Sequence, residues 1–437
     1  MFSNYEGLPK EAKYLIYSAV LPFIAYGMFY TDLSYFLTAV QGLSFELMGI
    51  VVTVMGVSTF VASIPLGVAA DKYGRKRLHI VGNVMACAII AVFALTTNLA
   101  ILLAAAVVEG ISEAAFAASA NALLAEKAEE ERRTSAYSLF SFVESVAFGL
   151  GSLMIPTIMI FESVGLTNKE SHVLLYLMLA ALGLVSTLFM FKITEPRRLK
   201  RRGVRVWDLL PKKSKDVLVK YILTSGMIAA GAGMVVPLMA AWLGLQYGIS
   251  DAVSGPILGI SSLATGVATL AAPPLAKKIG LVKAITVTQS VSTVFMFTIP
   301  LSPDYISAGF AYTLRSFLMN MANPLEQSLI MGIVIEDERG VASGVSSALW
   351  SLPNALSSFV GAWFMGLGLL AAPFFLAGLF YAVSIALFWH YFRNTRMPEE
   401  RRKQILRAKL STTVSEKRTK RLIIGRGENS TPTMRPI

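Results

Sequence analysis

Charged residues and cysteines are scarce in this sequence. Asp, Glu, Lys and Arg make up 15% of the 437 residues, whereas soluble domains carry about 25%. Cys87 is the single cysteine, so no disulfide can form within the chain. No small-residue cleavage site follows a short apolar core near the N-terminus, so we predict no cleavable signal peptide. The low charge content argues against a soluble domain.

Several functional motifs are also missing. The chain has no G-x-x-x-x-G-K-[ST] run, with which many ATP-hydrolysing proteins bind phosphate. It has neither an H-E-x-x-H run nor a cysteine–histidine set with metal-ligand spacing. No nucleophile–base set is visible at one face. We therefore predict no cofactor, no metal site and no enzymatic activity.

Long apolar runs dominate what is present. Hydrophobic residues make up 55% of the sequence, and about 20 apolar residues suffice for a helix to cross a bilayer. The runs lack the polar face of a soluble helix. We predict an all-α membrane protein with about twelve spans, at residues 14–40, 45–70, 78–96, 99–125, 134–161, 172–194, 217–243, 252–276, 281–300, 305–334, 341–368 and 372–392.

The net charge of +12 comes mainly from connectors and the C-terminal tail. These cations form no groove-like face with interleaved aromatic residues, so we predict no nucleic-acid partner. Of 39 Lys and Arg residues, 37 fall on one side of the predicted spans, the exceptions being Lys169 in a connector and Arg315 within a span. The positive-inside rule places that side in the cytoplasm. We expect a multi-pass protein of the plasma membrane with both termini cytoplasmic.

The two halves of the chain resemble each other at a constant offset in the numbering, 206 throughout. The matches are Gly42, Ser44 and Gly49 with Gly248, Ser250 and Gly255, and Glu130, Arg133 and Ala136 with Glu336, Arg339 and Ala342. Because each half holds six predicted spans, the repeat is parallel. The domains we predict are a first bundle at 1–194, a basic cytoplasmic linker at 195–216, a second bundle at 217–392 and a basic cytoplasmic tail at 393–437.

The tail contains 13 cations and 4 carboxylates. One interpretation is a solvated extension. The other is adhesion to anionic lipid headgroups, worth about 1 kcal/mol for each Lys or Arg near the surface.

The connector after the second predicted span reads GVAADKYGRKRL, from Gly67 to Leu78. It resembles the signature loop of the major facilitator superfamily, G-x-x-x-D-[RK]-x-G-R-[KR]. The span number, the repeat and the long central connector extend the resemblance to about 380 residues. It implies two six-helix bundles around a central cavity, with transport by rocking one bundle against the other.

The resemblance also assigns roles within this loop, to Gly67, Asp71, Gly74, Arg75 and Arg77. Asp71 would face the start of the eleventh span near Gly340 and help to hold the outward-facing state, since a carboxylate is stabilised near a helix N-terminus.

Each of the other loop residues has an expected role. Gly67 would permit close helix approach and Gly74 a tight turn. Arg75 and Arg77 would pair with carboxylates or lipid phosphate. The repeat copy, PPLAKKIGLVKA, keeps only Gly280 of the pattern, so we expect the contact on one side only.

The fourth span carries Glu109 and Glu113, which share one helix face at i and i+4. An ionised side chain at the bilayer centre costs about 2.5–3.5 kcal/mol, so a proton or a nearby cation is expected. Arg315 occupies the position equivalent to Glu109 in the second copy of the repeat and would face it across the cavity. We interpret the three as a proton-coupling or substrate site. The alternative is a structural ion pair between the halves.

Three further carboxylates in predicted spans are candidate proton sites, namely Asp32, Glu144 and Glu326, although neighbouring polar groups could satisfy each of them. Three histidines lie at span ends, where we expect interfacial positions, namely His79, His172 and His390. Several aromatic and amide residues are candidates to line the cavity, although packing or interfacial belts would also explain them, namely Tyr26, Tyr30, Trp242, Trp350 and Asn354.

Without an ATP motif, the energy for transport must come from a gradient, or the protein is a facilitator. Acidic residues beside an aromatic-rich cavity resemble the family's drug and proton exporters. We therefore expect a monomeric transporter that moves a small organic compound by proton-coupled alternating access, with multidrug export as one form of this expectation. One alternative is an importer or facilitator of a metabolite or organic anion, with Arg315 as the anion's partner. A non-transporting membrane sensor is an alternative of another class.

Overall fold

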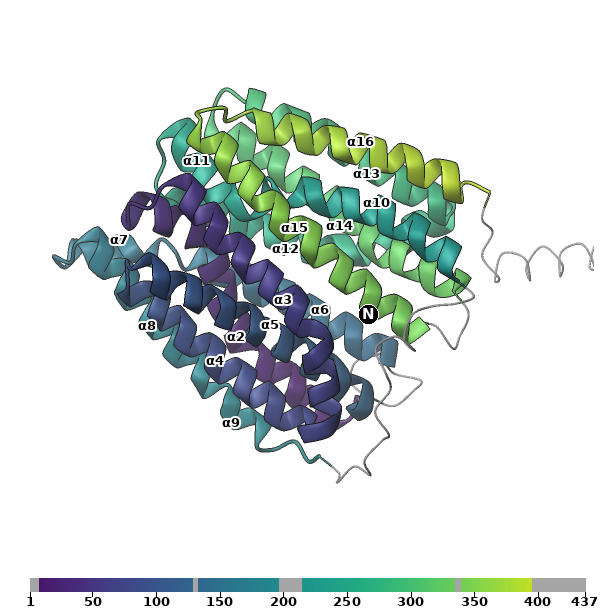
Figure 1. The fold of residues 1–437 in the computed structure, drawn as a ribbon, viewed down its shortest axis with the longest axis horizontal. Helices are drawn as coiled ribbons and strands as arrows, with labels where there is room; N and C mark the ends of the chain where they lie inside the picture. Colours follow the sequence, from purple (N-terminus) through teal and green to yellow (C-terminus); the bar gives the residue numbers. More distant parts are fainter. Residues whose placement is uncertain (1–7, 129–132, 196–213, 335–338, 395–437) are drawn as a thin grey trace, which may run out of the picture.

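The computed structural model describes residues 8–128, 133–195, 214–334 and 339–394 (Figure 1). Within these ranges the regular structure is entirely helical. The predicted linker and tail fall almost wholly outside the described residues.

The first half forms the purple-to-teal bundle of Figure 1. Its elements are α2 (Lys10–Tyr35), a π-helical turn (Phe36–Val40), α3 (Phe45–Tyr73), α4 (Arg75–Leu95), α5 (Leu99–Lys127), α6 (Arg133–Leu153), α7 (Thr157–Ser163), α8 (Asn168–Val185) and α9 (Thr187–Met190).

The second half forms the teal-to-yellow bundle. Its elements are α10 (Lys215–Gly233), a 3-10 turn (Val236–Leu238), α11 (Met239–Tyr247), α12 (Asp251–Ile279), α13 (Leu281–Thr298), a 3-10 turn (Ile299–Leu301), α14 (Tyr305–Ile333), α15 (Arg339–Gly366) and α16 (Ala372–Phe392).

The helix boundaries confirm the internal repeat. Both ends of α12 follow those of α3 by the same offset that relates the two copies in the sequence, and both ends of α14 follow those of α5 by that offset as well. The turns repeat too, because Gly74 and Gly280 have φ angles of +106° and +91°. A left-handed φ of this kind favours glycine, which explains why this position survives in the second copy.

Polar side chains cap the N-termini of several helices at one end of the bundle. Ser44 caps α3 by accepting a hydrogen bond from the amide of Leu47. Asn98 caps α5 and Asp304 caps α14, and these two caps occupy equivalent positions in the two copies of the repeat. They satisfy amides that have no partner inside the helix.

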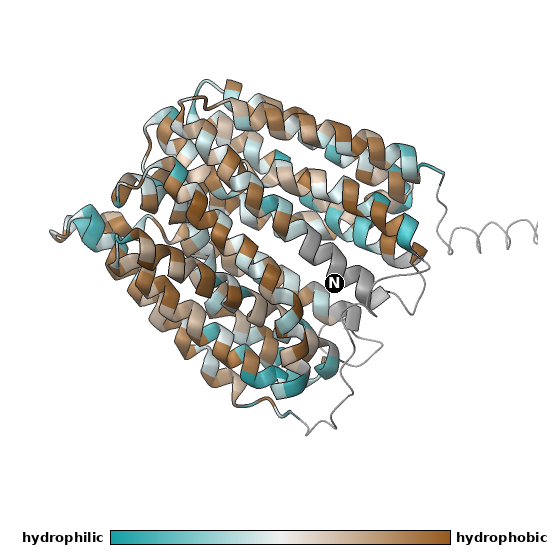
Figure 2. Cartoon of the chain, in the orientation of Figure 1, coloured by the Kyte–Doolittle hydropathy of each residue, from teal (hydrophilic) through white to brown (hydrophobic). Residues whose placement is uncertain are grey.

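Ten helical segments among the described residues are long and apolar enough to cross a membrane. Many large apolar side chains are exposed, which fits this environment, and hydrophobic residues run along most of the helices in Figure 2. The ten do not include α14 or α15, which correspond to the predicted spans at 305–334 and 341–368. The count of twelve spans therefore stays a prediction.

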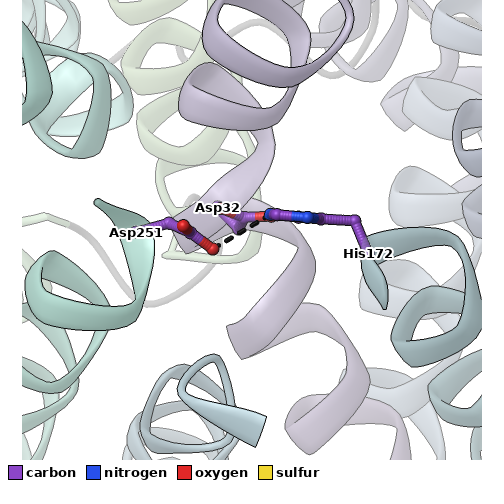
Figure 3. A group of neighbouring side chains, drawn as sticks. All are labelled: Asp32, His172 and Asp251. Atoms are coloured by element: carbon purple, nitrogen blue, oxygen red, sulfur yellow. Dashed lines mark hydrogen bonds and ion pairs between the residues drawn. The ribbon is translucent and has the colours of Figure 1, made fainter. Parts of the chain in front are cut away.

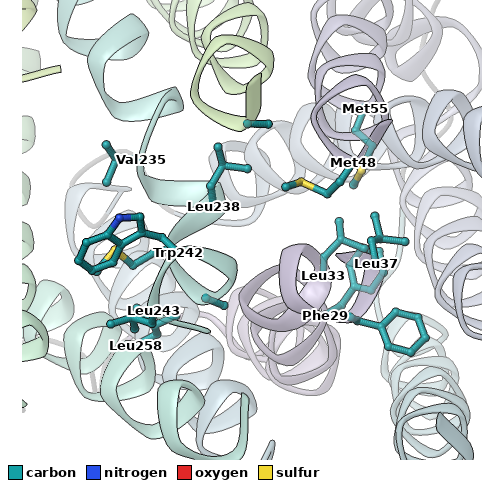
Figure 4. Packing of buried hydrophobic residues seen from close by; sticks show 14 of the residues in the cluster. Phe29, Leu33, Leu37, Met48, Met55, Val235, Leu238, Trp242, Leu243 and Leu258 are labelled. Carbon is teal, nitrogen blue, oxygen red and sulfur yellow. The ribbon is translucent and has the colours of Figure 1, made fainter. Parts of the chain in front are cut away.

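The two ends of the bundle differ in how the halves meet. We call the end that carries the turn at Gly74 the motif end, and the end that carries the turn at Gly42 the far end. Toward the far end, one buried apolar cluster contains residues of both halves, including Leu33 and Met48 from the first and Leu238 from the second (Figure 4).

Toward the motif end, two other apolar clusters each stay within one half. One runs from Leu8 to Ile193 and the other from Leu218 to Phe392. Among the described residues, the apolar core that both halves share thus lies toward the far end, and the clusters toward the motif end each belong to one half.

Candidate functional site

A cavity of about 730 Å³ lies between the two halves. Helices α2, α5 and α6 line it from the first half. From the second half it is lined by α10, the 3-10 turn after it, α12, α14, α15 and α16. Its lining reaches Asn121, Tyr137 and Asn323, which lie in the motif-end parts of α5, α6 and α14. This volume lies within the range of cavities that bind small organic molecules, about 300–1,000 Å³.

The first half contributes the acidic wall of this cavity. Glu113 lines it with an exposed side chain, and its Oε2 accepts a hydrogen bond from Thr59 Oγ1 at 3.0 Å. Glu144 of α6 lines it as well. Two carboxylates therefore face one compartment from neighbouring helices.

Glu109 lies behind this wall. It is fully buried, and it accepts hydrogen bonds from Tyr30 Oη at 3.1 Å and from Ser112 Oγ at 3.2 Å. It is not among the residues that line the cavity. The expectation that Glu109 faces Arg315 across the cavity is corrected, because Glu109 is fully buried and its hydrogen-bond partners Tyr30 and Ser112 both belong to the first half.

Arg315 of α14 is the basic residue of the cavity wall. It is 4% exposed, it donates a hydrogen bond from Nη2 to Tyr381 Oη, and its guanidinium lies 5.4 Å from the centre of the Tyr381 ring. Among the described residues its Nε has no hydrogen-bond partner. No ion pair within 4.0 Å joins it to Glu113 or Glu144 in the part of the chain that the structure describes. A polar ligand could therefore bind between separated charges of opposite sign.

Most of the predicted aromatic residues line the cavity. Tyr26 and Tyr30 stack with ring centres 5.6 Å apart, and Trp350 and Asn354 line the wall of the second half. The expectation that Trp242 lines the cavity is wrong. It is fully buried toward the far end, donates from Nε1 to the carbonyl of Leu370 at 2.9 Å, and does not line the cavity.

Asp32 and Glu326 also lie outside the cavity lining. Glu326 accepts a hydrogen bond from Gln289 Nε2 at 2.5 Å, so a neighbouring amide satisfies it within the second half.

Asp32 belongs to a buried group with His172 and Asp251, which we call the far-end cluster (Figure 3). His172 Nε2 lies 3.0 Å from Asp251 Oδ2 and 3.8 Å from Asp32 Oδ2. Asp32 comes from α2 and His172 from α8, whereas Asp251 begins α12 in the second half. Sequence reasoning missed this group because its members are far apart in the chain.

Two of the three histidines at predicted span ends are buried inside the bundle. His172 is fully buried in the far-end cluster, and His79 is 2% exposed with its Nδ1 3.2 Å from Ser119 Oγ. His390 is exposed near the end of α16.

The signature loop has well-defined partners at the motif end. Arg75 Nη1 lies 3.3 Å from Glu126 Oε2 and donates to the carbonyl of Ala122 at 2.9 Å. The carboxylate of Glu195 accepts from the amides of Arg75 and Lys76, at 2.7 and 3.1 Å. Glu195 thus caps α4, a role that the sequence did not indicate.

The structure describes no contact of the expected kind for the other loop residues. A Cβ at Gly67 would meet no described atom within 4 Å, so the structure does not support the expected close helix approach there. Arg77 is exposed. The side chain of Asp71 and those around Gly340 lie outside what the structure describes.

Comparison with known proteins gives matches over most of the chain. The model of the family described as Major Facilitator Superfamily matches residues 15–231 and again residues 221–426. The uncharacterized membrane protein YJR124C of Saccharomyces cerevisiae (strain ATCC 204508 / S288c) is 21% identical over 385 residues, which cover 76% of this chain and 86% of the yeast protein.

Solved structures match the fold. A mutant of the nucleoside transporter NupG has a TM-score of 0.72 at 13% identity, covering 88% of this chain and 100% of that one. A bacterial homolog of the human lysosomal transporter Spinster, inward-facing and unoccupied, has a TM-score of 0.69 at 14% identity, covering 87% and 95%. A D-xylose-proton symporter has a TM-score of 0.68 at 15% identity, covering 86% and 97%.

Proposed function

This chain belongs to the major facilitator superfamily, and from that premise we propose that it moves a small organic solute across the plasma membrane by proton-coupled alternating access. The cavity lies between the halves and its lining extends toward the motif end. The shared apolar core closes the far end. With the motif end in the cytoplasm, this arrangement is an inward-facing state.

The observation that carries proton coupling is the pair of carboxylates on the cavity wall. Glu113 and Glu144 face the compartment that would alternate between the two sides of the membrane. An ionised carboxylate in a membrane interior is costly, and such residues mark ion pathways by default. We infer that Glu113 exchanges the proton and that Glu109, one helical turn away and fully buried, sets its affinity as the second member of a coupled pair.

Transport into proteoliposomes tests this proposal. Purified protein would be reconstituted with an imposed pH gradient and a pH-sensitive dye inside. Candidate solutes would include nucleosides and D-xylose, after the structural relatives, and lipophilic cations, after the family's drug exporters. We expect solute movement to be accompanied by a proton flux, and we expect Glu113→Gln to abolish gradient-driven accumulation while leaving exchange of bound solute largely intact.

Glu162→Gln is the matched control, because Glu162 lies in the exposed far-end helix α7 and outside the cavity lining. It should retain full accumulation. If variants of Glu109 and Glu113, alone and together, also retain it, the pair is structural. Coupling would then belong to another carboxylate such as Glu144, or the protein would be a facilitator.

One observation favours a second candidate function, an importer or facilitator of an organic anion. Arg315 lines the cavity and its Nε lacks a partner among the described residues. An arginine fork binds carboxylate or phosphate groups in bidentate geometry. Saturable uptake of an anionic solute with no proton flux would favour this function over multidrug efflux.

The proposed topology has twelve spans with both termini on the cytoplasmic side. The ten apolar helices together with α14 and α15 would give twelve spans, in bundles at 1–194 and 217–392. The basic linker at 195–216 and the tail at 393–437 would place both termini in the cytoplasm beside anionic lipid. We propose that the protein acts as a monomer, since each chain holds both halves of the cavity.

A further inference from the structure

The far-end cluster is not needed for the proposed transport chemistry, yet it gathers three ionisable side chains in the protein interior. Asp32, His172 and Asp251 are 0%, 0% and 2% exposed. Each offers one donor atom, and these atoms all lie within 4.8 Å of one another. Burial of two carboxylates is unfavourable unless positive charge accompanies them.

The hydrogen bonds of the histidine fix which nitrogen faces the carboxylates. His172 Nδ1 lies 2.7 Å from the carbonyl oxygen of Asn168. A carbonyl can only accept, so Nδ1 carries a hydrogen and donates it. In the neutral imidazole the lone pair is then on Nε2, which points at the oxygens of Asp251 and Asp32 (Figure 3). Three electron-pair donors therefore converge on one point.

Among the residues that the structure describes, no Lys or Arg brings positive charge to this point. Among the described residues, neither Asp32 nor Asp251 forms an ion pair with Lys or Arg. Asp32 Oδ1 is buried and has no hydrogen-bond partner there, so the carboxylate keeps an unused acceptor. With both carboxyl groups ionised, a protonated His172 would still leave one net negative charge. A divalent cation bound to neutral His172 and two carboxylates would leave none.

The arrangement also has the features that hold ligands in place at metal sites. Tyr176 Oη donates to Asp32 Oδ2 at 2.9 Å, and Phe36 stacks on the His172 ring with centres 5.4 Å apart. Outer hydrogen bonds of this kind fix the tautomer and orientation of ligands. Tetrahedral zinc with bonds of about 2.0–2.2 Å separates its donors by roughly 3.3–3.6 Å. The two separations from His172 Nε2, 3.0 and 3.8 Å, lie on either side of that range, and the oxygens of Asp32 and Asp251 lie within 4.8 Å of each other.

We propose that Asp32, His172 and Asp251 bind a single divalent transition-metal ion such as Zn²⁺, and that this ion bridges the two halves and stabilises closure of the far end. Asp32 and His172 belong to the first half and Asp251 to the second. The complete ligand set therefore exists only while the far end is closed. A ligand that binds one state better than another shifts the population toward that state.

Direct binding of Zn²⁺ to the purified full-length protein tests the site. The protein would be freed of its affinity tag, stripped with a chelator, and titrated with ZnCl₂ by calorimetry in detergent. We expect one Zn²⁺ per chain with a Kd in the micromolar range or below. We expect at least tenfold weaker binding for His172→Gln, and the same for Asp251→Asn from the other half.

The control is His79→Gln, the same change at a buried histidine outside the cluster. It should bind Zn²⁺ like the wild type. Each variant's melting temperature without metal would show that it is folded. Zn²⁺ should then raise the melting temperature of the wild type and of His79→Gln, but not that of His172→Gln.

Either of two results would overturn the proposal. One is the absence of stoichiometric Zn²⁺ binding to the wild type. The other is equal binding by His172→Gln and the wild type, which would place the metal elsewhere. Both results are independent of the transport assay, because neither requires a solute or a pH gradient.

Discussion

The pair between His172 and Asp251 gives a quantitative expectation for how the far end stays closed in the metal-free protein, in which a protonated His172 can donate to Asp251. The two atoms are 3.0 Å apart and both side chains are almost inaccessible to solvent, so water and salt screen the contact little. A hydrogen bond to a charged group contributes about 1.5–3 kcal/mol. Asp251→Ala removes this contact between the halves. It leaves the Asp32–His172 contact, which lies within the first half.

A free-energy difference of about 1.4 kcal/mol between two states changes their population ratio about tenfold. Asp251→Ala should therefore raise the ratio of far-end-open to far-end-closed molecules by about 10- to 100-fold. Pulsed EPR can measure this with spin labels at Thr97 and Pro303, two exposed far-end turn residues from opposite halves, in a Cys87→Ser background with a chelator present. A new population at longer distance should appear.

The matched control is Asp216→Ala, which removes an exposed pair with Lys220 within α10. Surface pairs of this kind contribute about 0.3–0.5 kcal/mol and this one does not join the halves, so the distances should not change. If Asp251→Ala also leaves the distribution unchanged, then the apolar core alone keeps the far end closed and the reasoning fails.

Four further predictions address other parts of the molecule. A cysteine at Asn168 should react with an impermeant reagent from outside the cell and one at Ser214 should not, and the reverse pattern would refute the proposed topology. Glu195→Ala should lower the melting temperature through loss of about 0.5–2 kcal/mol of capping, and an unchanged melting temperature would mean that the two amide contacts of 2.7 and 3.1 Å do not stabilise α4. Arg315→Ala should raise the KM for anionic solutes at least tenfold and Arg315→Lys less, whereas equal KM values would remove the arginine from substrate binding. Asp71→Asn should lengthen spin-label distances across the motif end through loss of about 0.3–1 kcal/mol, and unchanged distances would make the loop a topology signal only.

The fold was readable from the sequence because its strongest signals are local or periodic. Apolar runs of membrane length identify helices without any knowledge of their neighbours. The constant offset between the two copies of the repeat relates the boundaries of α12 to those of α3. Gly74 marked a turn because its φ of +106° disfavours residues with a side chain.

The site could be predicted only in part from the sequence, because its lining depends on which face of each helix points toward the cavity. Trp242 shows the difficulty. A single span at 217–243 assumes one continuous helix, but α10 ends at Gly233 and a 3-10 turn at Val236–Leu238 precedes α11. Such a break changes the direction of every later side chain, so periodicity across it no longer predicts a face. The far-end cluster was invisible for another reason, since no local pattern links Asp32, His172 and Asp251.

Closure of the far end combines two kinds of interaction that respond to different signals. The apolar cluster that includes Leu33, Met48 and Leu238 is non-directional, and its contribution scales with the buried area. No proton or ion alters it directly. The His172–Asp251 contact joins the same two halves through charge, and its strength depends on which positive species is present. A transporter must pass through both states, so the apolar core can set the resting preference while the charged contact provides the part that a ligand can adjust.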